Sequence, residues 1–276
     1  MAVTNGAMKS GLPLMNVVRF KGMPILEQLF LEEKLLRTTS DNWCIVNDGT
    51  NTPTIVMGTS GKALELVDIR SVLQDKVPVI RRFTGGGTVI VDKGTVFVTL
   101  ICNKDALPGV QPYPRTIMSW SGLLYGKVFQ GMGDFQLREN VMDFLNLILD
   151  YVFGNQKFGG NAQSITKNRW VHHTSFLWDY EAKNMSYLRL PTRAPTYRLA
   201  RDHLEFVCRM KKYISRTIFV ERTLKALESH FSILEINSET IGTSNGTTFV
   251  PSTSLLSRQE LEDALISPLE RIAHSG

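Results

Sequence analysis

The spacing of apolar residues predicts four helices along the chain. Between residues 25 and 37, Leu29 and Phe30 lie three and four residues after Leu26, and Leu36 lies seven residues after Leu29, with polar residues between them. This is the period of an amphipathic helix. Similar spacing, with serine or glycine at one end, predicts helices over 116–133 and 215–231, the latter with Ser215 as N-cap. A shorter helix is predicted near 258–266.

Runs rich in β-branched residues predict strands between these helices. The predicted strands cover 42–48, 52–60, 77–82, 88–102, 157–165 and 170–180. The turn residues at 49–53 separate the first two strands. Because strands and helices mix without a strict βαβ alternation, the sequence predicts an α+β domain and not a doubly wound one.

Composition divides the chain into three parts. Residues 1–23 contain no Asp or Glu, which is compatible with a short organelle-targeting segment. The main domain is expected over 24–236. From 237 to 276 the chain becomes rich in Ser, Thr and Gly, so we expect a mobile polar tail that carries the short helix and no accessory domain.

Charge and hydropathy narrow the function classes. The 276 residues are 43% hydrophobic and 21% charged, as in an ordinary globular protein. No apolar run reaches the roughly 18 residues that suggest a membrane span. The net charge of +5 favours an anionic partner, but without a Lys/Arg run interleaved with aromatics nucleic acid is not favoured. Three widely spaced cysteines, Cys44, Cys102 and Cys208, suggest neither a zinc site nor a disulfide framework.

A glycine-rich turn lies in the segment IRRFTGGGTVIVDKGTVFVTL, residues 80–100. Successive backbone N–H groups in such a turn form a nest that binds anions, and Arg81 and Arg82 add donors suited to phosphate or carboxylate. The alternative is a tight hairpin whose glycines 85–87 merely permit the turn, and the turn alone does not decide between the two. It is not a P-loop, because no Gly-Lys-Ser/Thr follows. It is not a dinucleotide fingerprint either, because a strand follows the glycines.

A second candidate cluster lies between residues 154 and 173. Lys157 stands just before Gly159 and Gly160, where a strand lysine could contact both a phosphate and a carboxylate. Such a group could stabilise an adenylation transition state. The alternative, a surface lysine beside a bulge, is favoured for one lysine taken alone. His172 and His173 are adjacent on a strand, so one should face inward and one outward, with packing or hydrogen-bonding roles.

Four motifs in this order resemble the lipoate–protein ligase A family. They are LEEKLLR (31–37), RRFTGGGTVIVD (81–92), KFGGNAQ (157–163) and HHTSFLWD (172–179), within a match from about 24 to 230. The resemblance implies the mixed β-sheet flanked by helices that this family shares with biotin–protein ligases. It also makes residues 24–236 a ligase catalytic domain.

The resemblance implies an activity as well. Members of the family use ATP and Mg²⁺ to activate lipoate as lipoyl-AMP, then pass the lipoyl group to a lysine of an acceptor domain. The implied partners are acidic lipoyl-acceptor domains, namely the glycine cleavage H protein and the E2 subunits of 2-oxoacid dehydrogenases. A basic enzyme would be steered toward them. Such acceptors make a mitochondrial location the expectation, with the cytoplasm or a plastid as alternatives.

Residue roles follow from the same resemblance. Lys157 would be the catalytic residue that contacts the carboxylate and the α-phosphate. Asn140 and Asp150 would contact the nucleotide or its magnesium ion, while the metal ligands themselves stay unassigned. The substrate and lipoyl-AMP site would comprise Arg82, Gly85, Gly86, Gly87, Thr88, Asn140, Asp150, Gly160, Ala162 and His173.

The sequence departs from the family pattern in ways that leave alternatives open. Residues 141–149 interrupt the family's R-x-N-D segment, so we interpret them as an insertion that could leave an acyl-adenylate-binding protein with impaired catalysis. Thr174 stands where the family usually has glycine. A second alternative is an octanoyl- or lipoyl-transferase that works through a thioester on Cys208, whose pKa Lys211 and Lys212 would lower. An ordinary buried cysteine is the favoured interpretation of that residue.

Overall fold

The β-branched segments form twelve strands in the computed structural model, which describes residues 11–141, 147–190, 196–241 and 249–266. In chain order they are β1 (Leu14–Lys21), β2 (Asn42–Asp48), β3 (Thr54–Met57), β4 (Val79–Arg81), β5 (Val89–Val91), β6 (Thr95–Asn103), β7 (Phe135–Val141), β8 (Leu147–Phe153), β9 (Gln156–Ile165), β10 (Arg169–Leu177), β11 (Ser232–Glu235) and β12 (Ser254–Leu255).

The strands pair into two sheets. The large sheet has the order β11-β1-β2-β6-β10-β9-β8-β7, and the small sheet has the order β12-β4-β3-β5. In the large sheet β1 runs parallel to β11 and to β2, and the remaining neighbours are antiparallel. The small sheet is mixed as well, because β3 and β4 run parallel. The predicted α+β class, a mixed sheet flanked by helices, is therefore confirmed.

Seven α-helices cover the sheets within the described ranges. They are α1 (Ile25–Thr38), α2 (Ala63–Leu66), α3 (Ile69–Asp75), α4 (Pro114–Val128), α5 (His203–Phe206), α6 (Arg216–Leu227) and α7 (Arg258–Leu265), joined by the 3₁₀ turns η1 (Ala182–Tyr187), η2 (Thr196–Arg198), η3 (Met210–Lys212) and η4 (Ser238–Thr240). The four predicted helices are all present. Ser215 caps α6 as expected, because its side chain accepts a hydrogen bond from the N–H of Ile218.

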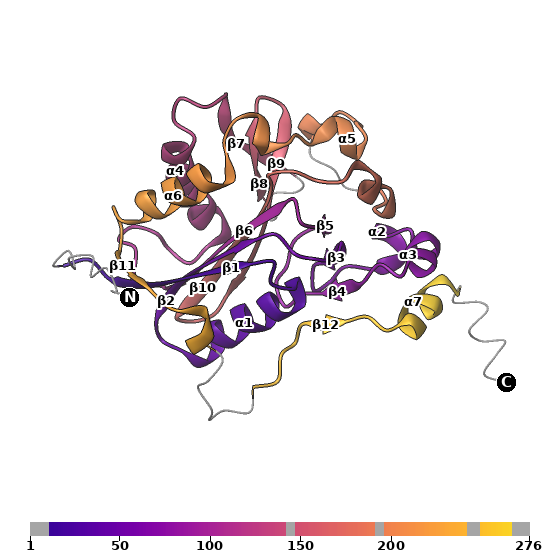
Figure 1. Cartoon of the computed structure of the whole chain (residues 1–276), viewed down its shortest axis with the longest axis horizontal. Coiled ribbons are helices and arrows are strands. Elements are labelled where there is room, and N and C mark those ends of the chain that lie inside the picture. Colours follow the sequence, from indigo (N-terminus) through magenta and orange to yellow (C-terminus); the bar gives the residue numbers. More distant parts are fainter. Residues whose placement is uncertain (1–10, 142–146, 191–195, 242–248, 267–276) are drawn as a thin grey trace.

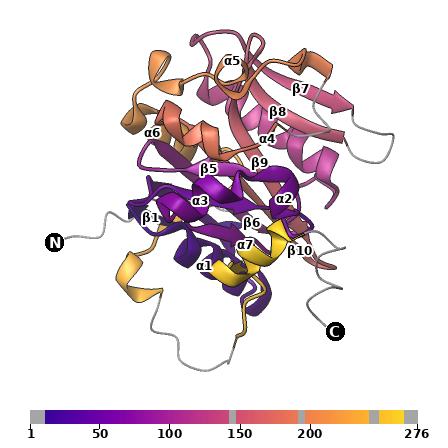
Figure 2. The same cartoon turned by 90° about the vertical axis from the view of Figure 1, so that its right-hand side faces the viewer.

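The elements stack in layers with three apolar cores between them (Figure 1). Helices α4 and α6 pack on one face of the large sheet over a core rich in aromatic rings, among them Tyr125, Phe129 and Phe176. Helix α1 packs with part of the small sheet on the opposite face. Helices α2, α3 and α7 cover the far side of the small sheet (Figure 2).

One predicted strand is in fact two strands that belong to different sheets. The expectation of a continuous strand over 88–102 is wrong, because the chain leaves the small sheet after Val91 and enters the large one at Thr95. The carboxylate of Asp92, which is 4% exposed, holds the turn by accepting from the N–H of Gly94 at 2.8 Å. It also accepts from the N–H of Glu181 and the side chain of Asn184. The Asp at the end of the glycine motif therefore anchors the segment that follows β10.

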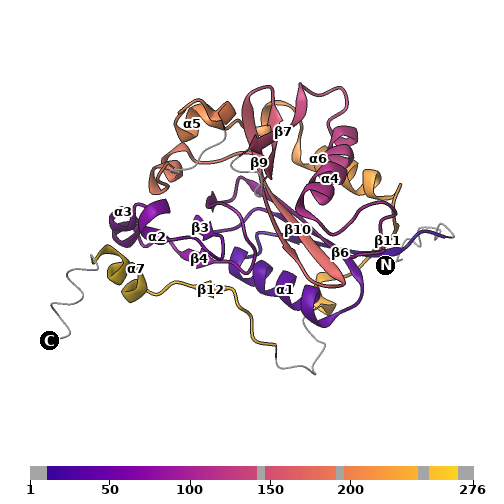
Figure 3. The same ribbon diagram turned by 180° about the vertical axis from the view of Figure 1, so that it is seen from behind.

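Both ends of the described chain are part of the fold. Strand β1 lies within the segment 1–23, yet it pairs with β2 and β11 and its Met15 and Val18 are fully buried. The expectation of a mobile tail is wrong for 249–266, since β12 pairs with β4 and α7 packs on α2 and α3 (Figures 1 and 3). None of the helices in the described part of the chain is both long and apolar enough to cross a membrane.

A buried cluster fastens this C-terminal segment to the rest. The carboxylate of Glu33 in α1 accepts from the backbone N–H groups of Ser252 and Thr253, at 3.0 and 3.2 Å. The Thr253 hydroxyl in turn accepts from the N–H of Phe83, two residues after the end of β4, at 3.1 Å. Three segments distant in sequence therefore meet just before the glycine turn.

We expect Thr253→Val to destabilise the protein. The substitution keeps the side-chain shape but leaves the buried N–H of Phe83 without an acceptor, which costs about 1–3 kcal/mol. Urea unfolding measures the loss, with Ser254→Ala at the neighbouring exposed position as the control. Equal stability of the two variants would contradict the role assigned to Thr253.

Candidate functional site

The glycine turn lies between the two sheets. It connects β4 to β5 in the small sheet and rests on β9 of the large sheet. A Cβ placed on Gly86 would be 3.3 Å from the carbonyl oxygen of Asn161 and 3.5 Å from Cβ of Ala162. The structure therefore brings together two motifs that are 75 residues apart in sequence, as the resemblance requires.

Arg82 organises this turn from beneath. Its side chain is buried and donates to the carbonyl oxygens of Gly85 and Gly87, both at 2.9 Å, and to Thr84 Oγ1 at 2.8 Å. It also donates to the carbonyl oxygen of Val56 at 3.2 Å. Burial lowers the pKa of Arg82 to about 10, against the raising effect of the nearby Glu32. The guanidinium stays charged at neutral pH, and the expectation that it touches a ligand stays a prediction.

The other side of the turn presents donors. Because Arg82 holds two of its carbonyl oxygens, these do not face an approaching anion. The backbone N–H groups of Gly85, Gly86 and Gly87 donate no hydrogen bond within the described part of the chain. The Oγ1 atom of Thr88 is buried and also has no partner there. An orphaned polar atom beside unpaired N–H groups favours the anion cradle over the plain hairpin.

A second glycine makes the turn possible. A Cβ on Gly58, which follows β3, would lie only 2.2 Å from the carbonyl oxygen of Gly86. Gly86 itself has φ +107°, and its own Cβ would lie 2.8 Å from Arg82 Nη2. Neither position accepts a side chain without displacing the turn. Sequence reasoning missed Gly58, and its only signal was a glycine inside the predicted strand 52–60.

A β-bulge decides which way Lys157 faces. The β8–β9 register shifts by one residue, from Tyr151 opposite Gly159 to Val152 opposite Lys157, so Phe158 is the extra residue. Phe158 is fully buried in the aromatic core, and the missing Cβ of Gly159 would also point there, 3.0 Å from Tyr151. Lys157 therefore takes the opposite face together with Gly160, whose Cβ would meet Val89 of the small sheet.

Lys157 forms an ion pair on that face. Its Nζ lies 2.6 Å from Oδ1 of Asp150, and the Lys157 side chain is 24% exposed whereas that of Asp150 is 2% exposed. The other oxygen of Asp150 accepts from the hydroxyl of Tyr197 at 2.7 Å. The surface-lysine alternative is thereby disfavoured. Sequence reasoning missed Tyr197, because nothing in the pattern brings η2 next to β8.

The residues interpreted as an insertion lengthen a hairpin. Val141 pairs with Leu147, and residues 142–146 lie outside the described residues. Asn140 is opposite Ile148. It lies two residues further along β7 than Arg138, which is opposite Asp150. The Asp150–Lys157 contact is present in the structure beside this hairpin, and the insertion itself stays a hypothesis. Contacts of Asn140 and Asp150 with a nucleotide or magnesium stay predictions.

The cradle and the lysine are separated along β9. Asn161 lies four positions after Lys157, but one of the residues between them is the bulged Phe158, so about three regular rises of roughly 3.3 Å put the two backbone positions on the order of 10 Å apart. A ligand that spans both positions along the strand is elongated, and it carries negative charge near each end or spread along the face.

His173 belongs to a buried polar chain under the same turn. Its Nδ1 lies 2.8 Å from the carboxylate of Glu32, which is fully buried in α1, and its Nε2 lies 3.4 Å from Thr84 Oγ1. Glu32 also accepts from Thr99 at 2.6 Å and from Gln28 at 2.7 Å. Glu32 thus connects α1 to the glycine turn through His173. The signal for Glu32 in the sequence was the pair of adjacent glutamates in the first motif, LEEKLLR.

His172 faces the other way. The two histidines lie on opposite faces of β10 as alternation predicts, but the expectation that one faces outward is wrong, because both faces of the sheet are covered. His172 contacts the Tyr151 hydroxyl at 3.2 Å and Gln163 at 3.1 Å. Burial, with a smaller effect of His173, lowers the pKa of His172 to about 3, so it is neutral at physiological pH.

Gly160 and Ala162 make close contacts with the protein itself. A Cβ on Gly160 would lie 3.1 Å from Ser175 Oγ and 3.3 Å from Val89, and Ala162 is 6% exposed beneath Gly86. Their small size therefore lets β10 and the small sheet approach β9. Contact between these two residues and a ligand stays a prediction.

Cys208 has the environment of a structural thiol. Its Sγ lies 3.7 Å from the carbonyl oxygen of Gln156, and burial raises its pKa to about 11 although Lys212 acts in the opposite direction. A thioester nucleophile needs a lowered pKa. The geometry therefore disfavours the thioester alternative, as the interpretation of an ordinary buried cysteine predicts.

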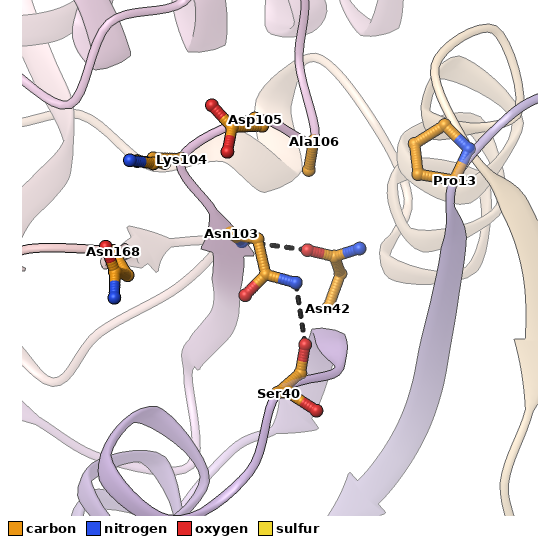
Figure 4. Close-up of a pocket in the computed structure, with 8 residues that line it drawn as sticks. All are labelled: Pro13, Ser40, Asn42, Asn103, Lys104, Asp105, Ala106 and Asn168. Carbon is orange, nitrogen blue, oxygen red and sulfur yellow. Dashed lines mark hydrogen bonds between the residues drawn. The ribbon is translucent and has the colours of Figure 1, made fainter.

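The described residues hold no cluster of three or more His, Cys, Asp or Glu side chains suited to a metal ion. A depression of about 580 Å³ lies elsewhere on the molecule, and Figure 4 shows Asn103 hydrogen-bonded to Asn42 and Ser40 on its wall. None of the residues that line it belongs to the site described above.

The known sequences that match this chain point to one protein family. Residues 24–232 match the lipoyl protein ligase A/B catalytic domain. A Plasmodium falciparum protein named inactive lipoate–protein ligase 2 is 28% identical over 74% of this chain and 66% of its own length. The probable lipoate-protein ligase A of Mycoplasma genitalium is 31% identical over 51% of this chain and 38% of its length. This chain thus spans less than two thirds of either relative. Octanoyltransferase LipM of Geobacillus kaustophilus is 24% identical over 66% of this chain and 71% of its length.

Solved structures share the fold. A lipoate-protein ligase A bound with ATP superposes with a TM-score of 0.66 at 15% identity, over 84% of this chain and 92% of that one. A Thermoplasma acidophilum structure, described as a bipartite lipoate protein ligase and its E2 lipoyl domain, gives 0.65 at 15% identity, over 84% and 90%. At this identity the likeness shows the fold alone.

We expect Gly86→Ala to destabilise the protein more than Gly109→Ala. Both glycines have positive φ, +107° and +79°, so both alanines carry backbone strain. Only the alanine at 86 also meets Arg82, because no atom lies within 4 Å of a Cβ at Gly109. Urea unfolding should show an extra loss of about 1–3 kcal/mol at position 86. Equal losses would mean that Arg82 yields to the new methyl group without cost.

We expect His172 to make the protein less stable in acid. Below pH 6.5 the unfolded chain takes up a proton that folded His172 does not accept until about pH 3. Its contribution to the free energy of unfolding therefore falls by about 2 kcal/mol from pH 7 to pH 5. Urea unfolding at both pH values should show a flatter pH dependence for His172→Gln than for the wild type. An unchanged slope would contradict the neutral, buried state of His172.

Proposed function

The chain belongs to the family of the lipoyl protein ligase A/B catalytic domain, and on this premise we propose that it is an ATP-dependent lipoate–protein ligase. It would form lipoyl-AMP and pass the lipoyl group to a lysine of an acceptor domain. The observation that carries the proposal is that Lys157 and the glycine turn occupy the same face of β9, spaced for an elongated anionic ligand. An acyl adenylate is such a ligand.

The proposed reaction uses the two ends of this face in different ways. In the first step a lipoate carboxylate oxygen bonds to the α-phosphorus of ATP, and the bond from that phosphorus to the pyrophosphate oxygen breaks. In the second step the amine of the acceptor lysine attacks the carbonyl carbon, loses a proton and displaces AMP. The Lys157 ammonium would offset negative charge on the carboxylate and phosphoryl oxygens in both steps, and the turn N–H groups would hold the ligand in place.

The residues that the structure describes offer no ready set of protein ligands for magnesium. Asp150, the carboxylate nearest Lys157, is already bonded to Lys157 and Tyr197. We therefore derive no step through a protein-bound ion, and propose that Mg²⁺ enters with the ATP phosphates, as is usual for this ion.

The proposed partners are lipoyl-acceptor domains, the H protein and E2 subunits. The Thermoplasma acidophilum ligase described with its E2 lipoyl domain supports this class of partner. The net charge of +5 favours the acidic members of the class. A mitochondrial location stays a prediction.

The test is the intact mass of an acidic lipoyl domain after incubation with this protein, lipoate, ATP and Mg²⁺. We expect a gain of one lipoyl group that requires ATP. Lys157→Ala should slow the reaction by about 100-fold or more, the usual cost of a lost electrostatic stabiliser. Lys62→Ala, which removes an exposed lysine paired only with Glu65, is the matched control. A mass gain that persists in Lys157→Ala would contradict the proposed role of Lys157.

Binding without turnover is the second candidate. Two observations favour it: Lys157 is held by a buried carboxylate, and a relative 28% identical is named inactive. It predicts that lipoyl-AMP binds, measured by calorimetry, while the acceptor mass does not change. A variant lacking residues 141–149 should then gain activity if those residues are the cause, and absence of a gain would contradict the insertion hypothesis.

A further inference from the structure

The turn that carries Tyr197 is built onto the strands of the proposed catalytic lysine. Tyr197 lies in η2 and its hydroxyl donates to Oδ2 of Asp150 at 2.7 Å, whereas Lys157 Nζ lies 2.6 Å from Oδ1. One buried carboxylate therefore holds two side chains, one on each oxygen. Neither the motifs nor the family resemblance assigns a role to this tyrosine.

Strain in the turn indicates that its position is enforced. The next residues after η2, Leu199 and Ala200, have φ +52° and +58°, the left-handed region that is sterically unfavourable for a non-glycine residue. Arg198 and Arg201 hold this conformation, since each donates from Nε to the other's carbonyl oxygen at 2.9 Å. Such strain persists only where the surroundings over-determine it.

The same turn is fixed to the hairpin between Asp150 and Lys157. Arg201 donates to the carbonyl oxygen of Asn155, in the β8–β9 connection, at 2.9 Å. Further along, the N–H of Cys208 donates to the carbonyl oxygen of Lys157 at 2.9 Å. The segment 197–208 thus contacts Asp150 by a side chain, the hairpin turn by Arg201 and the backbone of Lys157 directly.

We propose that Tyr197 is a positioning residue for Lys157 and acts through Asp150. Its hydroxyl occupies one carboxylate oxygen and orients the other toward the ammonium. Without the hydroxyl, the buried carboxylate turns both oxygens to Lys157 and holds it more tightly, so the ammonium is less available to a substrate. The consequence for adenylation rests on the proposed function, but the restraint on Lys157 does not.

Besides Asp150, the charges that act on Tyr197 are the cations Arg138 and Arg201, while Asp202 acts on the neighbouring Arg198. Arg138 of β7 lies over the Tyr197 ring at 5.7 Å, and Arg198 and Arg201 lie in the turn itself. Burial and the charge of Asp150 raise the pKa of Tyr197, so the hydroxyl keeps its proton and remains a donor. Asp150 is thus the acceptor between a neutral donor and an ammonium.

The first test measures the reactivity of Lys157 itself. Limiting acetic anhydride is applied to the full chain from pH 7 to 11, and peptide mass spectrometry compares Lys157 with exposed Lys62. In Tyr197→Phe we expect acetylation of Lys157 at pH 8 to fall by about tenfold, because a carboxylate that has lost its hydroxyl donor holds the ammonium more tightly. Tyr187→Phe is the matched control, because it removes a Tyr–Asp hydrogen bond of 2.6 Å to exposed Asp75.

Unchanged or increased Lys157 acetylation in folded Tyr197→Phe would overturn the proposal, as would an equal fall in Tyr187→Phe. Thermal melting establishes that each variant is folded. If Tyr197→Phe does not fold, Arg201→Gln takes its place, because it releases the turn from Asn155 and leaves the tyrosine intact. A fall in Lys157 acetylation is expected there too, and its absence would likewise overturn the proposal.

The second test separates this proposal from the proposed function. Lipoate-dependent exchange of pyrophosphate into ATP should show a kcat about 10- to 100-fold lower in Tyr197→Phe with little change in KM, the pattern expected for a misplaced group. A raised KM with unchanged kcat would overturn a positioning role. If the wild type catalyses no exchange, the proposed function fails while the acetylation result still decides the role of Tyr197.

Discussion

The site depends on one extra residue in a strand. Side chains alternate between the faces of a sheet, so without the bulge at Phe158 the side chain of Lys157 would share a face with Gly159. That face is the aromatic core, where an ammonium without a partner is very costly. The bulge turns Lys157 to the opposite face and at the same time lets Phe158 stack on Phe153, with ring centroids 4.2 Å apart. The same inserted residue therefore serves both the packing of one face and the charge on the other.

The second constraint is electrostatic. The fold buries several charged groups, and each is met by groups that compensate it. Glu32 has His173, Thr99 and Gln28, while Arg82 has the carbonyl oxygens of the turn. Since Arg82 holds those oxygens, the turn can present N–H groups with a fixed positive charge behind them. An anion cradle of this kind is preorganised by backbone and needs no flexible surface side chain.

Local patterns predicted the local parts of this arrangement. The glycines at 85–87, the arginines before them and the alternation of His172 and His173 are each properties of a few adjacent residues. The sequence raised a bulge beside Lys157 only as part of the surface-lysine alternative. Which residue is the extra one, and which face Lys157 then takes, is defined by the partner strand and not by the strand's own sequence. The split of 88–102 between two sheets and the contact of Tyr197 with Asp150 were missed for the same reason. Long-range pairing decided each of them.

The pairing of β12 with β4 also bears on the order in which the chain acquires its structure. Ser254 lies opposite Arg81, so these neighbours are 173 residues apart in sequence. A ribosome adds residues from the N-terminus, and a strand cannot pair before its partner has been made. The large sheet is complete once β11 has been made, whereas the edge of the small sheet beside the glycine turn waits for residues 254–255. During synthesis, therefore, the strand that leads into the glycine turn is a late edge, open to other chains until its own C-terminal segment arrives.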